Sequence, residues 1–240
     1  MPSHPFSMRL AVLSDIHANL DALTVVLAET DARGADALLC LGDVVGYGPD
    51  PGPCVDLVRE RCETTVMGNH DAAVALGIGT DVLPADGQTA VALHRSLLSA
   101  DHLAWLAALP FTDVVHGVTL AHASPERPDE WLRLDTFGAV QAQFATFGTA
   151  VCFIGHSHKP AVASDAVGVT RVRPGHRYLV NVGSVGQPRD HDPRAAFGLF
   201  DTETMAYELV RVHYDLARTR MRIADAGLPR YLGDRLSVGV

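Results

Sequence analysis

Five short fragments of this sequence carry the side chains that could do chemistry. They are Asp15-Ile-His17, Gly42-Asp43, Gly68-Asn69-His70-Asp71, the single His122, and Gly155-His156-Ser157-His158. Together they offer carboxylate, imidazole and amide groups from five separated points of the chain. This mixture of ligands suits Mn²⁺, Fe, Zn²⁺ or Ni²⁺ better than the all-oxygen shells that Ca²⁺ and Mg²⁺ prefer. The sequence therefore predicts a metal site that the fold must assemble from distant segments.

Each fragment follows an apolar run of the kind that forms a buried β-strand. The expected strands span 9–14, 37–41, 64–67, 118–121 and 150–154. Helices are expected from about Asn19 to Arg33 and from Cys54 to Arg61, which gives the strand–helix–strand alternation of a layered α/β sheet. Ligand groups collect at the carboxyl ends of strands in such sheets. We therefore expect the five fragments to meet at one edge.

The remaining pattern predicts a single domain over residues 8–240, preceded by a flexible arm at 1–7. Helical pieces over 71–110 interrupt the alternation and could form a cap above the site. The further elements expected are a hairpin of strands 111–115 and 118–121, a helix at 137–147, strands at 167–172, 178–182, 196–200 and 206–212, and a final helix at 215–226. The predicted class is α/β, a four-layer α-β-β-α sandwich of two mixed sheets flanked by helices.

Composition narrows the classes of partner. Of the 240 residues 48% are apolar and 20% are charged, which allows a core and excludes general disorder. No run approaches the ~20 apolar residues of a membrane helix, and the start lacks a signal peptide, so we expect a cytoplasmic protein without a membrane partner. The net charge is −9 and Lys159 is the only lysine. Without a basic stripe, a nucleic acid polymer is not an expected partner.

The five fragments, taken in order, resemble the motifs of the calcineurin-like metallophosphoesterase superfamily, and most closely its small bacterial phosphodiesterase branch. The resemblance implies two divalent ions per chain, with Mn favoured and Fe, Zn or Ni as alternatives. It implies that one ion is held by Asp15, His17, Asp43 and His158. It implies that the other is held by Asp43, Asn69, His122 and His156, with Asp43 as the bridge. A hydroxide between the two ions would then attack phosphorus.

The same resemblance assigns His70 to the leaving oxygen, which it would protonate or whose charge it would stabilise. Asp71 has two interpretations, a carboxylate at a helix N-terminus or a group that orients His70, and we favour a supporting role. Asn19 is first a helix cap and second a support for the ligands.

Two further residues are candidate substrate contacts, together with Asn69. Tyr47 could stack on a substrate ring or pack against Pro49. Arg189 ends the segment from Asn181 to Arg189, which resembles a family segment except that Val182 stands where proline is usual. Its guanidinium could bind a phosphate in bidentate fashion or pair with Asp190 or Asp192.

The favoured function is a phosphodiesterase that acts on small phosphorylated molecules. Phosphoprotein phosphatases and dinucleoside polyphosphate hydrolases of this superfamily usually have an arginine after the second motif. This chain continues instead as Gly42-Asp-Val-Val-Gly-Tyr47. A phosphomonoesterase or a dinucleoside polyphosphate hydrolase remains the alternative, and a non-catalytic scaffold of the same fold is a weaker one. The pattern leaves the oligomeric state open, with a homodimer as one alternative.

Overall fold

The computed structural model describes residues 7–166, 168–169 and 171–240, and in this part of the chain ten strands form two five-stranded sheets. The first sheet has the order β10-β9-β1-β2-β3 and the second has the order β4-β5-β6-β8-β7. The strands are β1 (Arg9–Leu13), β2 (Ala37–Cys40), β3 (Thr64–Thr65), β4 (Thr112–Val115), β5 (Val118–Ala121), β6 (Val151–Ile154), β7 (Ala161–Ser164), β8 (Tyr178–Asn181), β9 (Ala195–Asp201) and β10 (Tyr207–Val212). Both sheets are mixed: β1 pairs with β2 in parallel and with β9 antiparallel.

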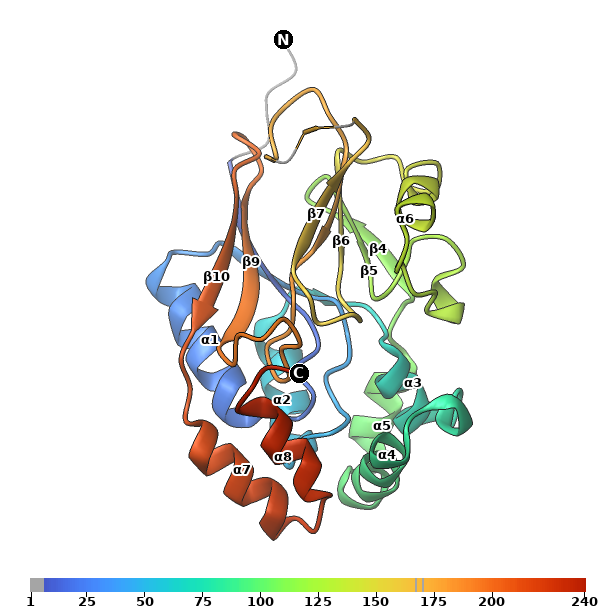
Figure 1. Cartoon of the computed structure of the whole chain (residues 1–240), viewed down its shortest axis with the longest axis vertical. Coiled ribbons are helices and arrows are strands. Elements are labelled where there is room, and N and C mark those ends of the chain that lie inside the picture. Colours follow the sequence, from blue (N-terminus) through green and yellow to red (C-terminus); the bar gives the residue numbers. More distant parts are fainter. Residues whose placement is uncertain (1–6, 167, 170) are drawn as a thin grey trace.

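Alternate residues of a strand point to opposite faces of its sheet, and the side chains of β1 are buried on both faces. In β1, Leu10 and Val12 pack between the sheets in one cluster with Phe153 of β6. Ala11 and Leu13 point the other way and pack with residues of the helices. The core thus has one part between the sheets and another between the first sheet and its helices. The predicted four-layer α/β sandwich is confirmed (Figure 1).

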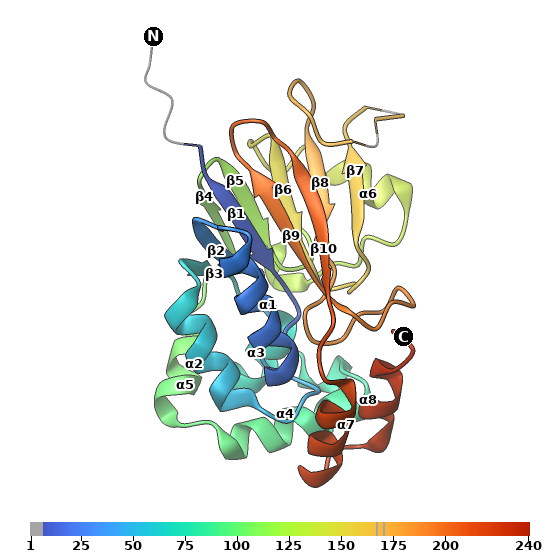
Figure 2. The ribbon, with the colours of Figure 1, turned by 90° about the vertical axis from the view of Figure 1, so that its left-hand side faces the viewer.

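Helices cover the outer faces of the sheets and gather at one end of the molecule. They are α1 (Leu20–Ala32), α2 (Pro51–Arg61), α3 (Asn69–Leu76), α4 (Ala85–Leu97), α5 (Ala100–Ala107), α6 (Phe137–Gln143), α7 (Leu216–Asp225) and α8 (Arg230–Leu236), with 3₁₀ turns η1 (Thr80–Val82) and η2 (Pro128–Glu130). Figure 2 shows α3, α4 and α5 together with α7 and α8 below the two sheets. No described helix is long and apolar enough to cross a membrane.

Several elements differ from the sequence-based prediction. A strand at 167–172 is wrong: residues 167 and 170 lie outside the described part, none of the other four is in a strand, and β7 lies earlier. Gly168, with φ +81°, turns the chain where the apolar pattern suggested a strand. Helix α2 begins at Pro51 rather than Cys54 because proline is favoured in a first turn. The predicted arm at 1–7 lies almost wholly outside the described residues.

Candidate metal centre

The predicted ligands follow strands whose carboxyl ends meet. Strands β1, β2 and β3 run parallel in the first sheet, and β5, β6 and β8 run parallel in the second. The segments that leave β1, β2, β3, β5 and β6 carry the five fragments. The structure therefore brings all seven predicted metal ligands to one place. Five of them are at most 2% exposed, namely Asp15, His17, Asp43, His122 and His158.

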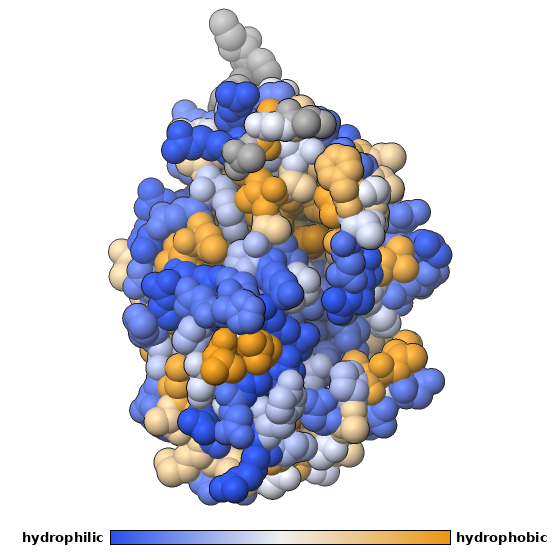
Figure 3. All heavy atoms as spheres, viewed as in Figure 1, coloured by the Kyte–Doolittle hydropathy of each residue, from blue (hydrophilic) through white to orange (hydrophobic). Residues whose placement is uncertain are grey.

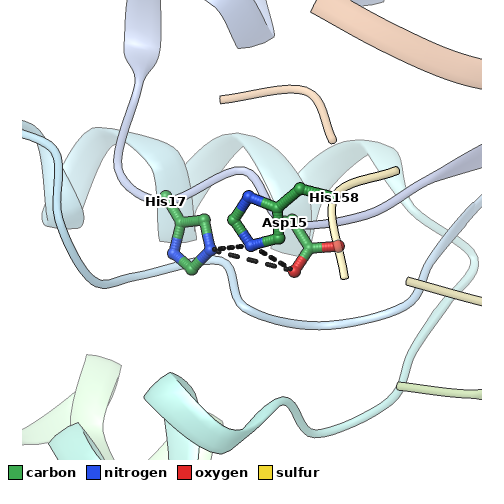
Figure 4. Close-up of side chains that lie close together, drawn as sticks. All are labelled: Asp15, His17 and His158. Carbon is green, nitrogen blue, oxygen red and sulfur yellow. Dashed lines mark hydrogen bonds and ion pairs between the residues drawn. The ribbon is translucent and has the colours of Figure 1, made fainter. Parts of the chain in front are cut away.

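One group of ligands consists of Asp15, His17 and His158, whose side chains point toward one another (Figure 4). Oδ1 of Asp15 lies 3.2 Å from Nε2 of His158 and 3.8 Å from Nε2 of His17. The two Nε2 atoms are 3.1 Å apart. Three potential donors of a metal bond thus surround one point between β1 and the segment after β6.

A second group surrounds Asp43. Its Oδ2 lies 3.4 Å from Nε2 of His122 and 3.6 Å from Nε2 of His17. Oδ1 of Asn69 lies 3.2 Å from Nε2 of His122 and 3.0 Å from Nδ1 of His156. Asp43 therefore lies between a ligand of the first group and the ligands of the second, which is the position that a bridging carboxylate requires.

Three of the histidines are held by hydrogen bonds at Nδ1, which leave Nε2 free to bind a cation. Nδ1 of His17, His122 and His158 lies 3.0, 2.8 and 2.5 Å from the backbone carbonyl of Val45, Leu41 and Gln187, respectively. A carbonyl only accepts, so each neutral ring carries its proton on Nδ1 and presents a bare Nε2 to the site.

Two bare nitrogens at 3.1 Å cannot bond each other, and the buried Oδ1 of Asp15 has no hydrogen-bond partner in the described part of the chain. A metal ion would satisfy all three atoms.

The protonation states agree with this interpretation. Burial lowers the pKa of His156 to about 3 and that of His17 well below its ordinary value. Burial alone would raise the pKa of Asp15, but the nearby imidazoles of His158 and His122 lower it further than burial raises it.

His122 is the exception. Burial lowers its pKa, but the charge of Asp43 raises it more, to about 9. A metal ion would replace that proton, and metal ligands must be deprotonated.

The backbone at the site is strained. Asp15, His17, Asp43, Tyr47, His156 and His158 have φ angles of 52°, 49°, 51°, 58°, 64° and 59°. Residues other than glycine rarely adopt this left-handed conformation, and each instance costs about 1–3 kcal/mol. Such strain persists only where the surrounding structure enforces it. Six of the twelve described non-glycine residues with a positive φ are predicted site residues, which supports this region as the candidate site.

Two glycines allow the ligand loops to approach each other closely. A Cβ on Gly68 would lie 2.1 Å from Oδ1 of Asp43, and a Cβ on Gly155 would lie 1.8 Å from Oγ of Ser14 and 2.5 Å from Oδ2 of Asp15. Any side chain larger than that of glycine would therefore push these loops apart at both positions.

His70 lies against the ligands, and its side chain forms no hydrogen bond with any described residue. Its backbone N–H donates to Oδ1 of Asp43 at 2.8 Å. The centroid of its ring lies 4.9 Å from the ring centroid of His17 and 4.4 Å from that of Tyr47. Its buried Nδ1 has no partner among the described residues. A ring nitrogen of His70 also lies within 4.8 Å of donor atoms of His17 and Asp43. Burial lowers its pKa to about 4.

The two supporting residues tie backbone segments together. Asp71 accepts from the backbone N–H groups of Gly68 and Val45 at 3.1 and 3.2 Å, so it holds two ligand loops together. Burial and the charge of Asp43 raise its pKa to about 7. Asn19 caps α1 through Ala22 N–H at 3.1 Å and donates to the carbonyl of Gly186 at 2.9 Å.

Arg189 is available to a ligand. In the described part of the chain it forms no ion pair, because Asp190 pairs with Arg211 and Asp192 pairs with Arg194. Its Nη2 donates to Oε1 of Gln187 at 2.6 Å, while its buried Nε has no partner among the described residues. The guanidinium carbon lies 5.6 Å from the ring centroid of Tyr47. Tyr47 itself is 6% exposed and packs with residues of α7 and α8, which leaves little ring surface for a substrate.

A cleft of about 380 Å³ lies over the ligands. One wall holds Asp43, Asn69, His70, His156, His158 and Arg189. The other comes from two segments, residues 79–84 and 130–133, whose lining includes Trp131 and Arg133. Of the predicted cap over 71–110, only 79–84 lines this cleft. Sequence reasoning missed the segment 130–133, because its residues match no motif and only the fold places them here.

Apolar residues on the face shown in Figure 3 form separate patches among polar ones, with no continuous band over its described part. That face therefore offers no broad apolar surface.

Comparison with known proteins shows the family of the chain and its fold. Residues 8–205 match the family model of the calcineurin-like phosphoesterase superfamily domain. The chain is 36% identical to an uncharacterised protein of Methanocaldococcus jannaschii, over 96% of this chain and 98% of that protein. The crystal structure of a metallophosphoesterase from Sphaerobacter thermophilus superposes with a TM-score of 0.85 at 36% identity, over 98% of this chain and all (100%) of that one. A hypothetical protein from Pyrococcus horikoshii shares the fold, with a TM-score of 0.80 at 22% identity over 97% and 98% of the two chains.

Proposed function

The chain belongs to the calcineurin-like phosphoesterase superfamily, and from this premise we propose that it is a phosphodiesterase that acts on small phosphorylated molecules with two divalent metal ions. The observation that carries the proposal is the pair of overlapping donor groups, Asp15–His17–His158 and Asp15–Asp43–His122, each with its donor atoms within 4.8 Å of one another. Asn69 and His156 complete the second group. Mn²⁺ is the ion we propose first, with Fe, Zn²⁺ and Ni²⁺ as alternatives.

When bound, two divalent ions would supply Lewis acidity for the phosphate oxygens and lower the pKa of a water molecule that serves as nucleophile. The residues of the chain do the rest. Buried carboxylates and carbonyl-anchored imidazoles hold the donor atoms in place before substrate arrives. Arg189 lines the cleft and forms no ion pair with any described residue, so its guanidinium is the proposed contact for a phosphate oxygen.

His70 is the proposed group at the leaving oxygen. Because burial lowers its pKa to about 4, its imidazole is neutral at pH 7. A neutral ring still carries one N–H, which can donate a hydrogen bond to the leaving oxygen as charge develops there. We therefore favour stabilisation of the leaving group over transfer of a proton from an imidazolium.

Two features support a small diester over the alternatives. The second ligand loop runs from Asp43 to Gly46 and Tyr47 without the arginine that related phosphatases and dinucleoside polyphosphate hydrolases use. The cleft of about 380 Å³ is closed opposite the ligands by a wall of residues 79–84 and 130–133, which suits a small molecule better than a polymer. A scaffold role is disfavoured because the full ligand set is present. We propose no membrane or nucleic acid partner, and a homodimer stays an open alternative.

The test is hydrolysis of bis(p-nitrophenyl) phosphate and p-nitrophenyl phosphate by metal-stripped protein with Mn²⁺, Ni²⁺, Zn²⁺ or Mg²⁺ added back. We expect turnover of the diester that depends on metal and exceeds that of the monoester. A preference for the monoester would make the protein a phosphatase. No turnover with any metal would favour the scaffold.

A further inference from the structure

A second cavity, of about 130 Å³, opens beside the metal cleft. We call it the side pocket. It lies between the outer face of β6, β7 and β8 and the segment that leads into α6. Its walls are mainly apolar and include Leu132, Leu134, Val140, Ile154 and Leu179. Nothing in the ligand set requires a cavity here.

The side pocket and the metal cleft share two residues, His156 and Arg133, as lining. His156 presents Nδ1 to Asn69 at 3.0 Å on the metal side. The two cavities therefore lie on either side of one imidazole that we assign to the metal site. A phosphate held in the cleft would have its ester group within reach of the side pocket.

The side pocket interrupts an apolar cluster that would otherwise be closed. Leu134, Val140 and Ala163 pack against the buried cluster that contains Ile154 and Leu179, and the same five residues line the cavity. The pocket opens to solvent, so its apolar lining faces water. A ligand group that enters the pocket would remove that apolar surface from water.

The polar groups at the pocket are engaged or exposed to solvent. Asn181 is fully engaged: its Nδ2 donates to the carbonyl of Gly155 at 2.5 Å and to Oγ of Ser157 at 3.0 Å, and its Oδ1 accepts from Gly183 at 3.0 Å. Lys159 is exposed, and Arg133 and Asp135 of the lining form an ion pair with each other. The apolar walls therefore decide the occupant, and they suit a rigid ring better than a hydrocarbon chain because a chain loses more conformational freedom when it binds.

Size points to the same class of occupant. An apolar cavity of about 150 Å³ in another protein takes one benzene molecule. The side pocket, at about 130 Å³, is therefore close to the size of one six-membered ring.

We propose that the side pocket is a substrate subsite for a single six-membered aromatic or heteroaromatic ring on the ester group of the phosphate. The inference rests on the proposed function, because it places the phosphate at the metal ions. It narrows the substrate class to phosphate esters that carry such a ring near the phosphorus.

The test is the affinity of Mn²⁺-loaded protein for non-hydrolysable phosphonates, measured by titration calorimetry. The probes are methylphosphonate, the ring series phenyl-, benzyl- and 2-phenylethylphosphonate, and n-hexylphosphonate as the chain control. We expect at least one ring compound to bind about tenfold or more tightly than methylphosphonate, and more tightly than the hexyl compound. Equal affinity of all compounds, or the tightest binding by the hexyl chain, would overturn the proposal.

Filling the pocket provides the matched variant. Ala163→Leu places a larger side chain among the lining residues, and Ala161→Leu does so from a more exposed position if the first variant folds poorly. Ala142→Leu, on an exposed position of α6 outside the pocket lining, is the control. We expect both pocket variants to lose the ring preference and keep methylphosphonate affinity within twofold, and the control to change neither. A ring preference that survives in both pocket variants would refute the subsite.

The same titrations separate this inference from the proposed function. If methylphosphonate binds and rings give no gain, the subsite fails and the metal-bound phosphate site stands. If the wild type binds none of the compounds and hydrolyses neither chromogenic ester, the proposed function itself fails.

Discussion

The substitution Gly155→Ala tests whether close approach of two loops positions the ligands. Gly155 follows β6 and directly precedes His156. A Cβ at this position would lie 1.8 Å from Oγ of Ser14 and 2.5 Å from Oδ2 of Asp15, whereas ordinary contact begins at 3.4 Å. That oxygen of Asp15 also accepts from Oγ of Ser14 at 2.7 Å and from the N–H of His156 at 2.9 Å. One methyl group therefore displaces a ligand and both of its supporting bonds.

The expected loss follows from the size of that displacement. To reach 3.4 Å, the contact with Ser14 must open by about 1.6 Å and the contact with Asp15 by about 0.9 Å, and a misplacement of about 1 Å costs about a hundredfold in rate. Loss of the bonds that orient a ligand typically lowers metal affinity by about 10- to 100-fold. Overpacking also lowers the free energy of unfolding by about 1–3 kcal/mol. We expect all three effects together.

The assay is metal content after dialysis against Mn²⁺, with turnover of a phosphodiester and thermal unfolding measured on the same samples. Gly148→Ala is the matched control, because a Cβ there meets nothing within 4 Å and the backbone conformation is ordinary. The control is expected to match the wild type in all three readings. Wild-type metal content and turnover in Gly155→Ala would refute the argument that this approach positions Asp15.

Three further predictions concern single residues of the site. Asp43→Asn is expected to weaken both metal sites at once because the bridge loses its charge, and full activity with two ions retained would contradict that role. His70→Ala is expected to keep both ions, by metal analysis, and to lose about a hundredfold or more in turnover; loss of metal would instead make His70 a ligand. Burial lowers the pKa of His94 from 6.5 to about 4. The folded state therefore binds fewer protons than the unfolded state between these values, and this stability is present above pH 6.5 and lost as pH falls toward 4. The loss is about 2 kcal/mol between pH 7 and pH 5. The free energy of unfolding, measured in urea at both pH values, should fall less between pH 7 and pH 5 in His94→Asn than in the wild type. An equal fall in both proteins would exclude His94 as its source.

The placement of the ligands could be predicted because it depends on local patterns. A buried strand that ends in a polar residue recurs at Asp15, Asp43, His122 and His156, and parallel strands place such ends at one edge. The strand order within each sheet could not be read from the sequence, since pairing between β1 and β9 depends on contacts more than 180 residues apart.

Some features of the site cannot be predicted from the local sequence. The left-handed backbone of Asp15 or His158 is imposed by the surrounding loops, because the residue type alone disfavours it. The cleft wall formed by Trp131 and Arg133 matches no motif and becomes apparent only when the chain is folded. The same holds for α8, which packs with Tyr47 through Leu232 and Leu236 although the last residues of the chain carry no recognisable pattern.

The weakest predictions lay where composition is ambiguous. The stretch from Ala161 to Ser164 has small side chains and little alternation of polarity, yet it forms β7 because it pairs with β8. The run that starts at Val167 is more apolar but contains Gly168, where the chain turns. Pairing partners decided the structure here, and local propensity did not.

The central claim is that the buried carboxylates and imidazoles form a centre for two metal ions. Elemental analysis of the wild-type protein, stripped of metal and then dialysed against Mn²⁺, tests it most directly. We predict two ions per chain, reduced in Asp43→Asn and unchanged in Gly148→Ala. A wild-type protein that retains no ion would contradict the claim.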